Sequence, residues 1–339
     1  REAFMSTECV SNVPQERDER VLSEHPVLII DGMNLFVRCY CAYPAVSSHG
    51  YQLGGMLGFI KTLTRLSIDL APSGIVIAWE GGGSQRRRML YPDYKMNRRP
   101  EKLNRFYQDD IPDSDENRLH QNVALIKLLK HVPVWQVYAD CCEGDDIIAH
   151  IVSGPLVNRS VIIGSSDKDM HQLLTARVRQ YSFHKKRVMT ADDVYAEYGI
   201  LAENFGIAKA VCGDPTDNVP GVPRIGFKTL TKHVPLLRRE GTLLDDVLKY
   251  AASHRQASLP CARIWADEDL VRRNWELVKL DISSLPASRS AQIMTVLSAE
   301  PPPLDIVGVC QILSDEGTSN LNVSELTTTF ARYVGCKIM

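Results

Sequence analysis

The chain has 339 residues, of which 44% are hydrophobic and 24% are charged, and its formal net charge is −2. These values are typical of a globular protein with one large domain or two unequal ones. The near-neutral charge gives no general indication of nucleic-acid binding, so such a function has to come from local patterning. No apolar run reaches the roughly 20 residues of a membrane span, and we therefore expect no membrane partner.

The nine cysteines include no CxxC pair. The short spacings of Cys39 with Cys41 and of Cys141 with Cys142 suit neither a disulfide framework nor a zinc site. We therefore expect reduced thiols in a cytoplasmic protein. Residues 1–25 are polar and charged and lack the apolar core of a signal peptide, so we predict a disordered leader there.

Four short apolar runs predict buried strands: 27–31, 75–79, 134–138 and 161–164. Leucines and an isoleucine recur at helical spacing over 53–66, and a further helix is expected to begin near Glu143. Strands that alternate with helices predict an α/β fold with a mainly parallel sheet flanked by helices. In such sheets the functional site lies at the carboxyl ends of the strands.

Two stretches break this alternation. Residues 81–120 are polar and contain no convincing strand, and from about residue 190 a helical region runs to about residue 273. We expect a core over 26–190 and a helical subdomain over 191–300. The proline run 301–303 predicts a linker, and the sequence gives no role for the tail 301–339.

Carboxylates give the strongest functional signal, because three of the four predicted strands lead into acids at their carboxyl ends. The acids in question are Asp31, Glu80, Glu143, Asp145, Asp146, Asp167, Asp169, Asp214 and Asp217. If the strands form as predicted, the first seven gather along one edge of the sheet. Glu143 and Asp146 share one helical face, whereas Asp145 lies off it and points to a neighbouring ligand position.

So many carboxylates in one place would repel each other by several kcal/mol unless cations compensate them. Oxygen-only ligands favour Mg²⁺ or Mn²⁺ over zinc. Two ions about 3.5–4 Å apart would serve phosphodiester hydrolysis, one activating water and the other stabilising the leaving oxygen. Each acid alone could instead be a helix cap. Five clusters at strand ends favour the metal site.

Cations are concentrated between Gly81 and Arg105, where the local charge is +6. The cations are Arg86, Arg87, Arg88, Lys95, Arg98, Arg99, Lys102 and Arg105. Tyr91 and Tyr94 lie among them, and cations with interleaved rings suit a single-stranded nucleic acid. A solvated charged face is the alternative, but the segment directly follows an acidic strand end.

A second segment, 213–229, reads GDPTDNVPGVPRIGFKT. Gly221 and Gly226 would permit a close backbone approach or a positive φ, and the following helix would present its N–H groups and Lys228 to a phosphate. A plain helix–turn–helix packing element is the alternative. It does not explain the two acids Asp214 and Asp217 just upstream.

Five motifs together resemble the bacteriophage and bacterial 5′-nucleases, also called flap endonucleases. They are DGMNLFVR (31–38), YPDYKMNRRP (91–100), EGDDIIA (143–149), SSDKDMHQL (165–173) and the segment 213–229. The match follows the family's motif order over roughly 27–235. The stretch 178–198 also looks like the phage members, which suggests a phage replication or recombination nuclease.

The resemblance implies a PIN-like (resolvase-like) core, a helical arch over 81–120 and a helix–three-turn–helix motif over 213–235. That motif grips duplex DNA in the family, often with a bound K⁺. The acids implied around one metal ion are Asp31, Glu80, Glu143, Asp145 and Asp167. Those implied around the second ion and its water shell are Asp146, Asp169, Asp214 and Asp217.

The resemblance also assigns roles to other residues. Lys95 and Arg98 match arch cations that neutralise the scissile phosphate and count with Asp31 and Asp167 as catalytic, while Tyr91 or Tyr94 would stack on the terminal base. The implied DNA contacts are Arg86, Tyr91, Tyr94, Lys95, Arg98, Arg99, Gly221, Gly226, Lys228 and Thr229. Two positions depart from the family: Glu80 stands where Asp is usual, and Arg224 where many members have glycine.

The sequence therefore predicts a metal-dependent, structure-specific DNA 5′ nuclease with 5′→3′ exonuclease and flap endonuclease activity. Its partners would be DNA with 5′ single-stranded ends, flaps or nicks, with RNA primers left open, and we expect a monomer in the cytoplasm of a bacterial host. A PIN-type endoribonuclease shares the acidic core but has no need of the segment 213–229. A catalytically silent DNA-structure binder would lack acids that are present here.

Overall fold

The computed structural model describes residues 25–98, 115–282 and 285–339. Its centre is a six-stranded sheet of order β3-β2-β1-β4-β5-β6. The strands are β1 (Val27–Asp31), β2 (Gly74–Gly81), β3 (Trp135–Asp140), β4 (Val161–Gly164), β5 (Val178–Ser182) and β6 (Arg187–Met189). All neighbours pair in parallel except β5 and β6, which form an antiparallel hairpin. The four predicted strands and the mainly parallel sheet are confirmed, and the hairpin adds two strands that were not predicted.

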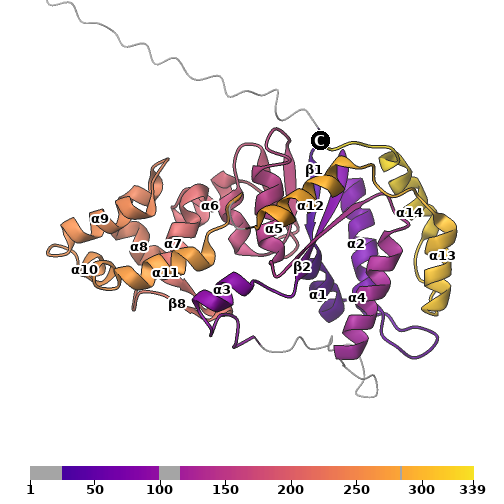
Figure 1. The fold of residues 1–339 in the computed structure, drawn as a ribbon, viewed down its shortest axis with the longest axis horizontal. Coiled ribbons are helices and arrows are strands. Elements are labelled where there is room, and N and C mark those ends of the chain that lie inside the picture. Colours follow the sequence, from indigo (N-terminus) through magenta and orange to yellow (C-terminus); the bar gives the residue numbers. More distant parts are fainter. Residues whose placement is uncertain (1–24, 99–114, 283–284) are drawn as a thin grey trace, which may run out of the picture.

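Helices cover both faces of this sheet (Figure 1). On one face α1 (Gly32–Ala42), α2 (Gly54–Leu70) and α4 (Asp115–Leu129) pack over Leu28 and Ile30 of β1. On the other face α5 (Gly144–Ser153) and α12 (Ala287–Ser298) pack over Val27 and Ile29. All five residues of β1 are buried, which explains why its sequence is an unbroken apolar run instead of an alternating one.

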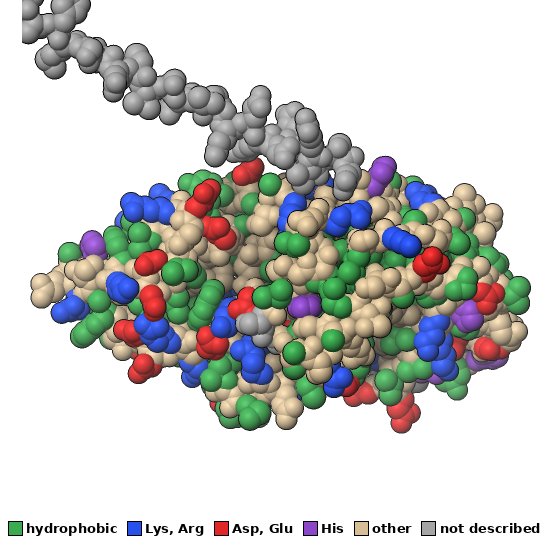
Figure 2. Space-filling model, turned by 45° about the horizontal axis from the view of Figure 1, so that its top comes forward, with side chains coloured by type: hydrophobic (Ala, Val, Ile, Leu, Met, Phe, Trp, Pro, Cys, Tyr) green, Lys and Arg blue, Asp and Glu red, His purple; other side chains and the backbone are tan. Residues whose placement is uncertain are grey.

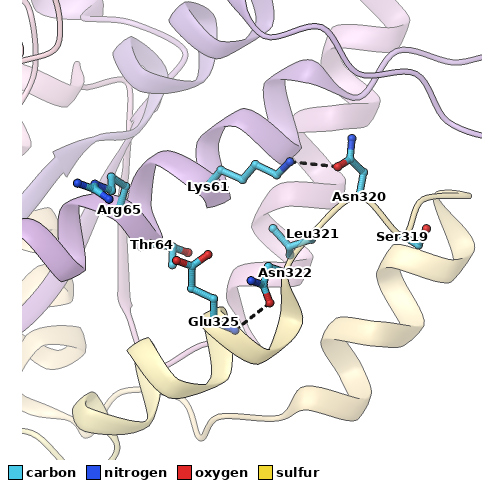
Figure 3. Close-up of a pocket in the computed structure, with 8 residues that line it drawn as sticks. All are labelled: Lys61, Thr64, Arg65, Ser319, Asn320, Leu321, Asn322 and Glu325. Carbon is cyan, nitrogen blue, oxygen red and sulfur yellow. Dashed lines mark hydrogen bonds between the residues drawn. The ribbon is translucent and has the colours of Figure 1, made fainter.

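The segment after Pro303 folds against the core. Its helices α13 (Ile306–Asp315) and α14 (Val323–Phe330) lie beside α4 and α2 and bury Val309, Leu326 and Phe330 with them. Near the end of the chain, Ile338 is fully buried and its carbonyl accepts a hydrogen bond from Arg159. A polar cavity of about 540 Å³ lies between α2 and the loop before α14, where Lys61 reaches Asn320 (Figure 3).

A helical subdomain with its own apolar core occupies the end of the molecule opposite α13 and α14 in Figure 1. It comprises α6 (Ala191–Tyr198), α7 (Phe205–Cys212), α8 (Phe227–His233), α9 (Leu244–His254), α10 (Leu259–Ala266) and α11 (Glu268–Val278). Between α7 and α8 the two-residue strands β7 (Gly213–Asp214) and β8 (Val219–Pro220) pair. A Cβ at Gly221 would overlap the carbonyl of Cys212, so only glycine allows this close approach.

Only part of the predicted arch lies within the described residues. After β2 the chain forms α3 (Gln85–Leu90) and a run of turns over 92–97, and beyond the described Arg98 the next described element is α4, which begins at Asp115. Arg99, Lys102 and Arg105 lie outside the described residues, so the arch prediction stays open there. The face in Figure 2 mixes acidic and basic side chains without a large patch of one sign. In the described part of the chain, no helix is both long and apolar enough to cross a membrane.

Candidate active site

Four carboxylates from four separate segments meet at the carboxyl edge of the sheet. Asp31 ends β1, Glu80 lies near the end of β2, Asp145 opens α5 and Asp167 follows β4. These four line one cavity of about 220 Å³ together with Asn34, Lys95 and Arg98, among others. The parallel register aligns the ends of β1, β2 and β4, which is why acids so distant in sequence converge. We call these four acids the strand-end acids.

Hydrogen bonds fix the deepest of the strand-end acids. Asp31 accepts from the backbone N–H of Asn34 at 3.1 Å and from the hydroxyl of Ser165 at 3.0 Å. Asp167 accepts from the backbone N–H of Asp169 at 2.9 Å. Both carboxylates therefore also cap helical turns. The sequence presented helix capping and membership of the acidic cluster as alternatives. In Asp31 and Asp167 the same side chain does both.

Burial perturbs the ionisation of three of the strand-end acids. Burial, reinforced by Asp145, raises the pKa of Asp31 to about 7 and that of Asp167 to about 6. The pKa of Glu80 is also raised, again chiefly by burial. Carboxyl groups that hold their protons to near neutral pH indicate a site that favours a cation.

Three further acids form a second group, because one oxygen each of Asp169, Asp214 and Asp217 lies within 4.8 Å of the others. We call them the subdomain acids. Unlike the strand-end acids, they are bound by cations of the protein. The ammonium of Lys209 forms ion pairs with Asp169 and, at 2.6 Å, with Asp214, and Arg98 approaches Asp217 at 2.7 Å.

Glu143 is the N-cap of α5 and Asp146 lies in its first turn, and both carboxylates contact Arg87. The buried guanidinium lies 2.9 Å from Glu143 and 2.7 Å from Asp146, and it donates to the carbonyl of Leu277. Lys95 approaches the other oxygen of Glu143 at 2.8 Å. Burial alone would raise the pKa of Glu143, but Lys95 and Arg87 outweigh it and hold that pKa below its usual value.

The segment 91–98 docks directly on the turn that carries the subdomain acids. The backbone N–H of Lys95 donates to the carbonyl of Asp217 at 2.9 Å, and Asn218 donates to the carbonyl of Asp93 at 2.8 Å. Lys95 has φ of 60°, so the turn is tight. This docking brings Lys95 and Arg98 to the cavity, although more than 100 residues separate them from Asp217.

The aromatic residues predicted to stack on DNA are placed differently. Tyr94 is only 6% exposed and its hydroxyl donates to Glu143 at 3.0 Å, so this conformation does not offer its ring for stacking. Tyr91 is half-buried with the guanidinium of Arg273 4.5 Å from its ring centre. Arg86 is exposed and donates to the carbonyl of Glu276.

The predicted duplex-binding residues lie on α8 and the turn before it. Lys228 is exposed and Thr229 half-buried in the first turn of α8, and Gly226 precedes that helix with open space around it. Neither Gly221 nor Gly226 has a positive φ; in this turn that conformation falls on Arg224, with φ of 62°.

Two charged residues of the site were not predicted, namely Arg87 and Lys209. Arg87 belongs to a run of three arginines, and nothing in the sequence shows which of the three is buried. Lys209 had a usable signal, because it is the only charge in the otherwise apolar helix α7. A lone cation on a buried helix indicates a buried acidic partner.

This geometry defines an oxygen-rich acidic site on a resolvase-like sheet, flanked by cations suited to phosphate. Residues 26–199 match the family model described as 5′-3′ exonuclease, N-terminal resolvase-like domain. The chain belongs to this family, which confirms the resemblance, the fold class and the enzyme class of nuclease.

Curated relatives agree with this assignment. The 5′-3′ exonuclease of Buchnera aphidicola subsp. Acyrthosiphon pisum is 30% identical over 214 residues, which are 61% of this chain and 69% of the relative. Flap endonuclease Xni of Shewanella piezotolerans is 27% identical over 256 residues, 75% of this chain and 91% of the relative.

Among solved structures, the fold is similar to that of the bacteriophage T5 5′-exonuclease with bound zinc, with a TM-score of 0.62 and 23% identity. That match covers 79% of this chain and 97% of the other. The bacteriophage T5 flap endonuclease in a pseudo-enzyme–product complex with DNA and metal ions gives a TM-score of 0.60 at 22% identity. It covers 86% and 98% of the two chains.

Proposed function

We propose that this chain is a structure-specific DNA 5′ nuclease that hydrolyses phosphodiester bonds as a 5′→3′ exonuclease and 5′-flap endonuclease. The observation that carries the proposal is the convergence of the four strand-end acids in one cavity with Lys95 and Arg98. Carboxylates suit hard metal ions, and the two cations suit the phosphate that such ions would act on. The relatives named 5′-3′ exonuclease and flap endonuclease support the same activity.

The donor set fits divalent Mg²⁺ or Mn²⁺. The strand-end acids offer only oxygen ligands, and burial and the neighbouring Asp145 raise the pKa values of Asp31 and Asp167, an effect that a bound cation would reverse. When bound, such ions would activate water and stabilise the leaving oxygen. The subdomain acids already hold Lys209 and Arg98, so a second ion there competes with protein cations. We therefore expect the first ion to bind more tightly than the second.

Four cationic side chains and one tyrosine have further roles in this proposal. Lys95 and Arg98 face the cavity and would orient the scissile phosphate and offset its growing negative charge. Arg87 lies deeper, where it pairs with Glu143 and Asp146 and holds both carboxylates in place. Tyr94 donates to Glu143 and acts as a positioning residue in this scheme. The exposed Lys228 would contact the duplex backbone away from the cut.

The test is cleavage of a 5′-labelled flap substrate with Mg²⁺ by the wild type and Asp145→Asn. Asp145 is suited to this test because it lines the cavity without a hydrogen bond within the described residues, so its amide should leave the fold intact. Asp192→Asn, at an exposed acid on α6, is the matched control. Wild type and control should cut near the flap junction, and Asp145→Asn should lose at least about 100-fold in rate. If the wild type and both variants all left the flap substrate intact, the proposal would be refuted.

The finer sequence-based predictions belong to the same proposal. Action on RNA primers, a monomeric state, cytoplasmic location, a K⁺ ion at the turn before α8 and a phage origin stay predictions. An RNA-primed flap in the same assay separates DNA from RNA specificity. Cutting of the RNA portion alone would favour the endoribonuclease alternative.

A further inference from the structure

Strained backbone marks an unusual cation on the helical subdomain. Among the described residues, six other than glycine have a positive φ, and three of these are Lys95, Lys186 and Arg224. Long cationic side chains seldom adopt this conformation, which favours glycine and asparagine. A strained residue persists only where its surroundings enforce it, and it invites a search for a function.

The turn around Arg224 is fixed at both ends. The backbone N–H of Ile225 donates to the carbonyl of Val222 at 3.2 Å, so Pro223 and Arg224 occupy the two central positions of a tight turn. Proline followed by a residue with positive φ is the pattern of a type II turn, whose third position calls for glycine. Val222 and Ile225 are 2% and 4% exposed, and Val222 is also bonded to Val211, so the turn has no room to relax.

Arg224 itself is exposed, and no ion pair or hydrogen bond of its guanidinium occurs among the described residues. The same holds for Lys228 and Lys232, which follow at intervals of four residues and are exposed on α8. Residues 218–239 contain five Lys or Arg and no Asp or Glu. This stretch therefore presents cations that no carboxylate of the same segment neutralises.

We propose that Arg224 is a phosphate-contacting residue of the duplex-binding turn and extends the cationic row of Lys228 and Lys232 by one contact. The inference rests on the proposed nuclease function. The anchored turn holds the guanidinium outward before DNA arrives, and a guanidinium can bind two phosphate oxygens at once. Arginine at a position that favours glycine thus strains the protein backbone locally but strengthens binding to the DNA backbone.

The test compares Arg224→Gly, Arg224→Gln and Arg224→Lys in the binding of a short DNA duplex over a range of salt concentrations. Losing one phosphate contact should reduce the slope of log K against log salt by about 0.9, which is about eight-fold in affinity at 0.1 M salt. Glycine and glutamine should both show this loss, and lysine should keep the wild-type slope. Glycine relieves the strain, so its melting temperature should equal or exceed that of wild type, and weaker binding cannot be ascribed to unfolding.

Ala71→Gly is the matched control, because Ala71 also has a positive φ, at the end of α2, and carries no charge. It should leave the salt slope unchanged. An unchanged slope in Arg224→Gly, or tighter binding because a bulky side chain has been removed, would overturn the inference while leaving the nuclease proposal intact. If the wild type neither binds duplex DNA nor cuts flaps, the proposed function itself fails.

Discussion

At the scale of single residues, Lys95 combines features that separate chemistry from binding. Its ammonium lies 2.8 Å from Glu143, it lines the cavity of the strand-end acids, and its backbone is held at a positive φ by the bond to Asp217. Such a side chain is prearranged for one position in the site. It has little freedom to follow the DNA backbone elsewhere.

Lys95→Ala should therefore slow cleavage far more than it weakens binding. We expect a loss of about 10²–10³ in single-turnover rate, as for other preorganised groups that stabilise transition-state charge, and a change in duplex Kd of less than about three-fold. Binding is measured in an Asp145→Asn background so that substrate is not consumed. Lys228→Ala should give the converse, weaker binding with a reduced salt slope. Equal losses in rate and affinity for Lys95→Ala would contradict the role.

At the scale of elements, a strand or helix could be predicted when its own sequence carries the pattern that identifies it. β1, β2 and β4 were predictable because buried parallel strands leave unbroken apolar runs that end in acids. The β5–β6 hairpin was missed, since the buried positions of β5 include the polar Gln180 and Ser182 and its partner strand is only three residues long. Helices α13 and α14 were also missed. Their burial depends on α2 and α4, which lie far away in sequence.

The candidate site divides in the same way. The acids were predictable from strand ends and motifs, and most of them do converge. Their partners Arg87 and Lys209 were not, because a salt bridge between distant segments leaves no local pattern. Tyr94 shows the opposite failure: an aromatic residue among arginines suggested stacking on DNA, whereas docking on Asp217 buries it.

Arg87 joins three elements, since it extends from α3 to the acids at the start of α5 and to the end of α11. Arg87→Met should destabilise the protein by about 3–5 kcal/mol, because it leaves the buried Asp146 without its cationic partner and Glu143 with Lys95 alone. Urea denaturation measures this loss. Arg88→Met, at the exposed neighbouring position, should stay within about 0.5 kcal/mol of wild type. A wild-type midpoint for Arg87→Met would show that the buried pair contributes no stability.

At the scale of the whole molecule, the site couples the sheet to the helical subdomain. The strand-end acids lie at the carboxyl edge of the sheet, and the subdomain acids lie in the turn after α7, apart from Asp169. The segment 91–98 bridges the two through Lys95 and Arg98. Cation binding at the strand-end acids should thus stabilise the folded molecule as a whole, and it should do so in a pH-dependent manner.

The sign of this dependence follows from the raised pKa values. Asp31 and Asp167, with pKa values of about 7 and 6, hold protons in the folded state that the unfolded chain has already lost. Their contribution to stability is therefore present below about pH 4 and is lost as the pH rises towards 7. A divalent ion requires the ionised carboxylates and releases these protons, so the stabilisation by Mg²⁺ should grow over the same range.

We predict that the rise in melting temperature caused by Mg²⁺ is small at pH 5 and reaches its full size near pH 8. If each ion displaces one proton, the apparent affinity falls about tenfold per pH unit below about pH 6. Burial lowers the pKa of His150 and His171, so these residues destabilise the fold on acidification. This effect is the same with and without Mg²⁺, and it therefore cancels in the difference between the two melting temperatures. Asp145→Asn should lose most of the Mg²⁺ effect at every pH. A Mg²⁺ effect that does not vary between pH 5 and 8 would mean that the ion binds elsewhere, because only buried, protonated carboxyl groups link its binding to pH in this range.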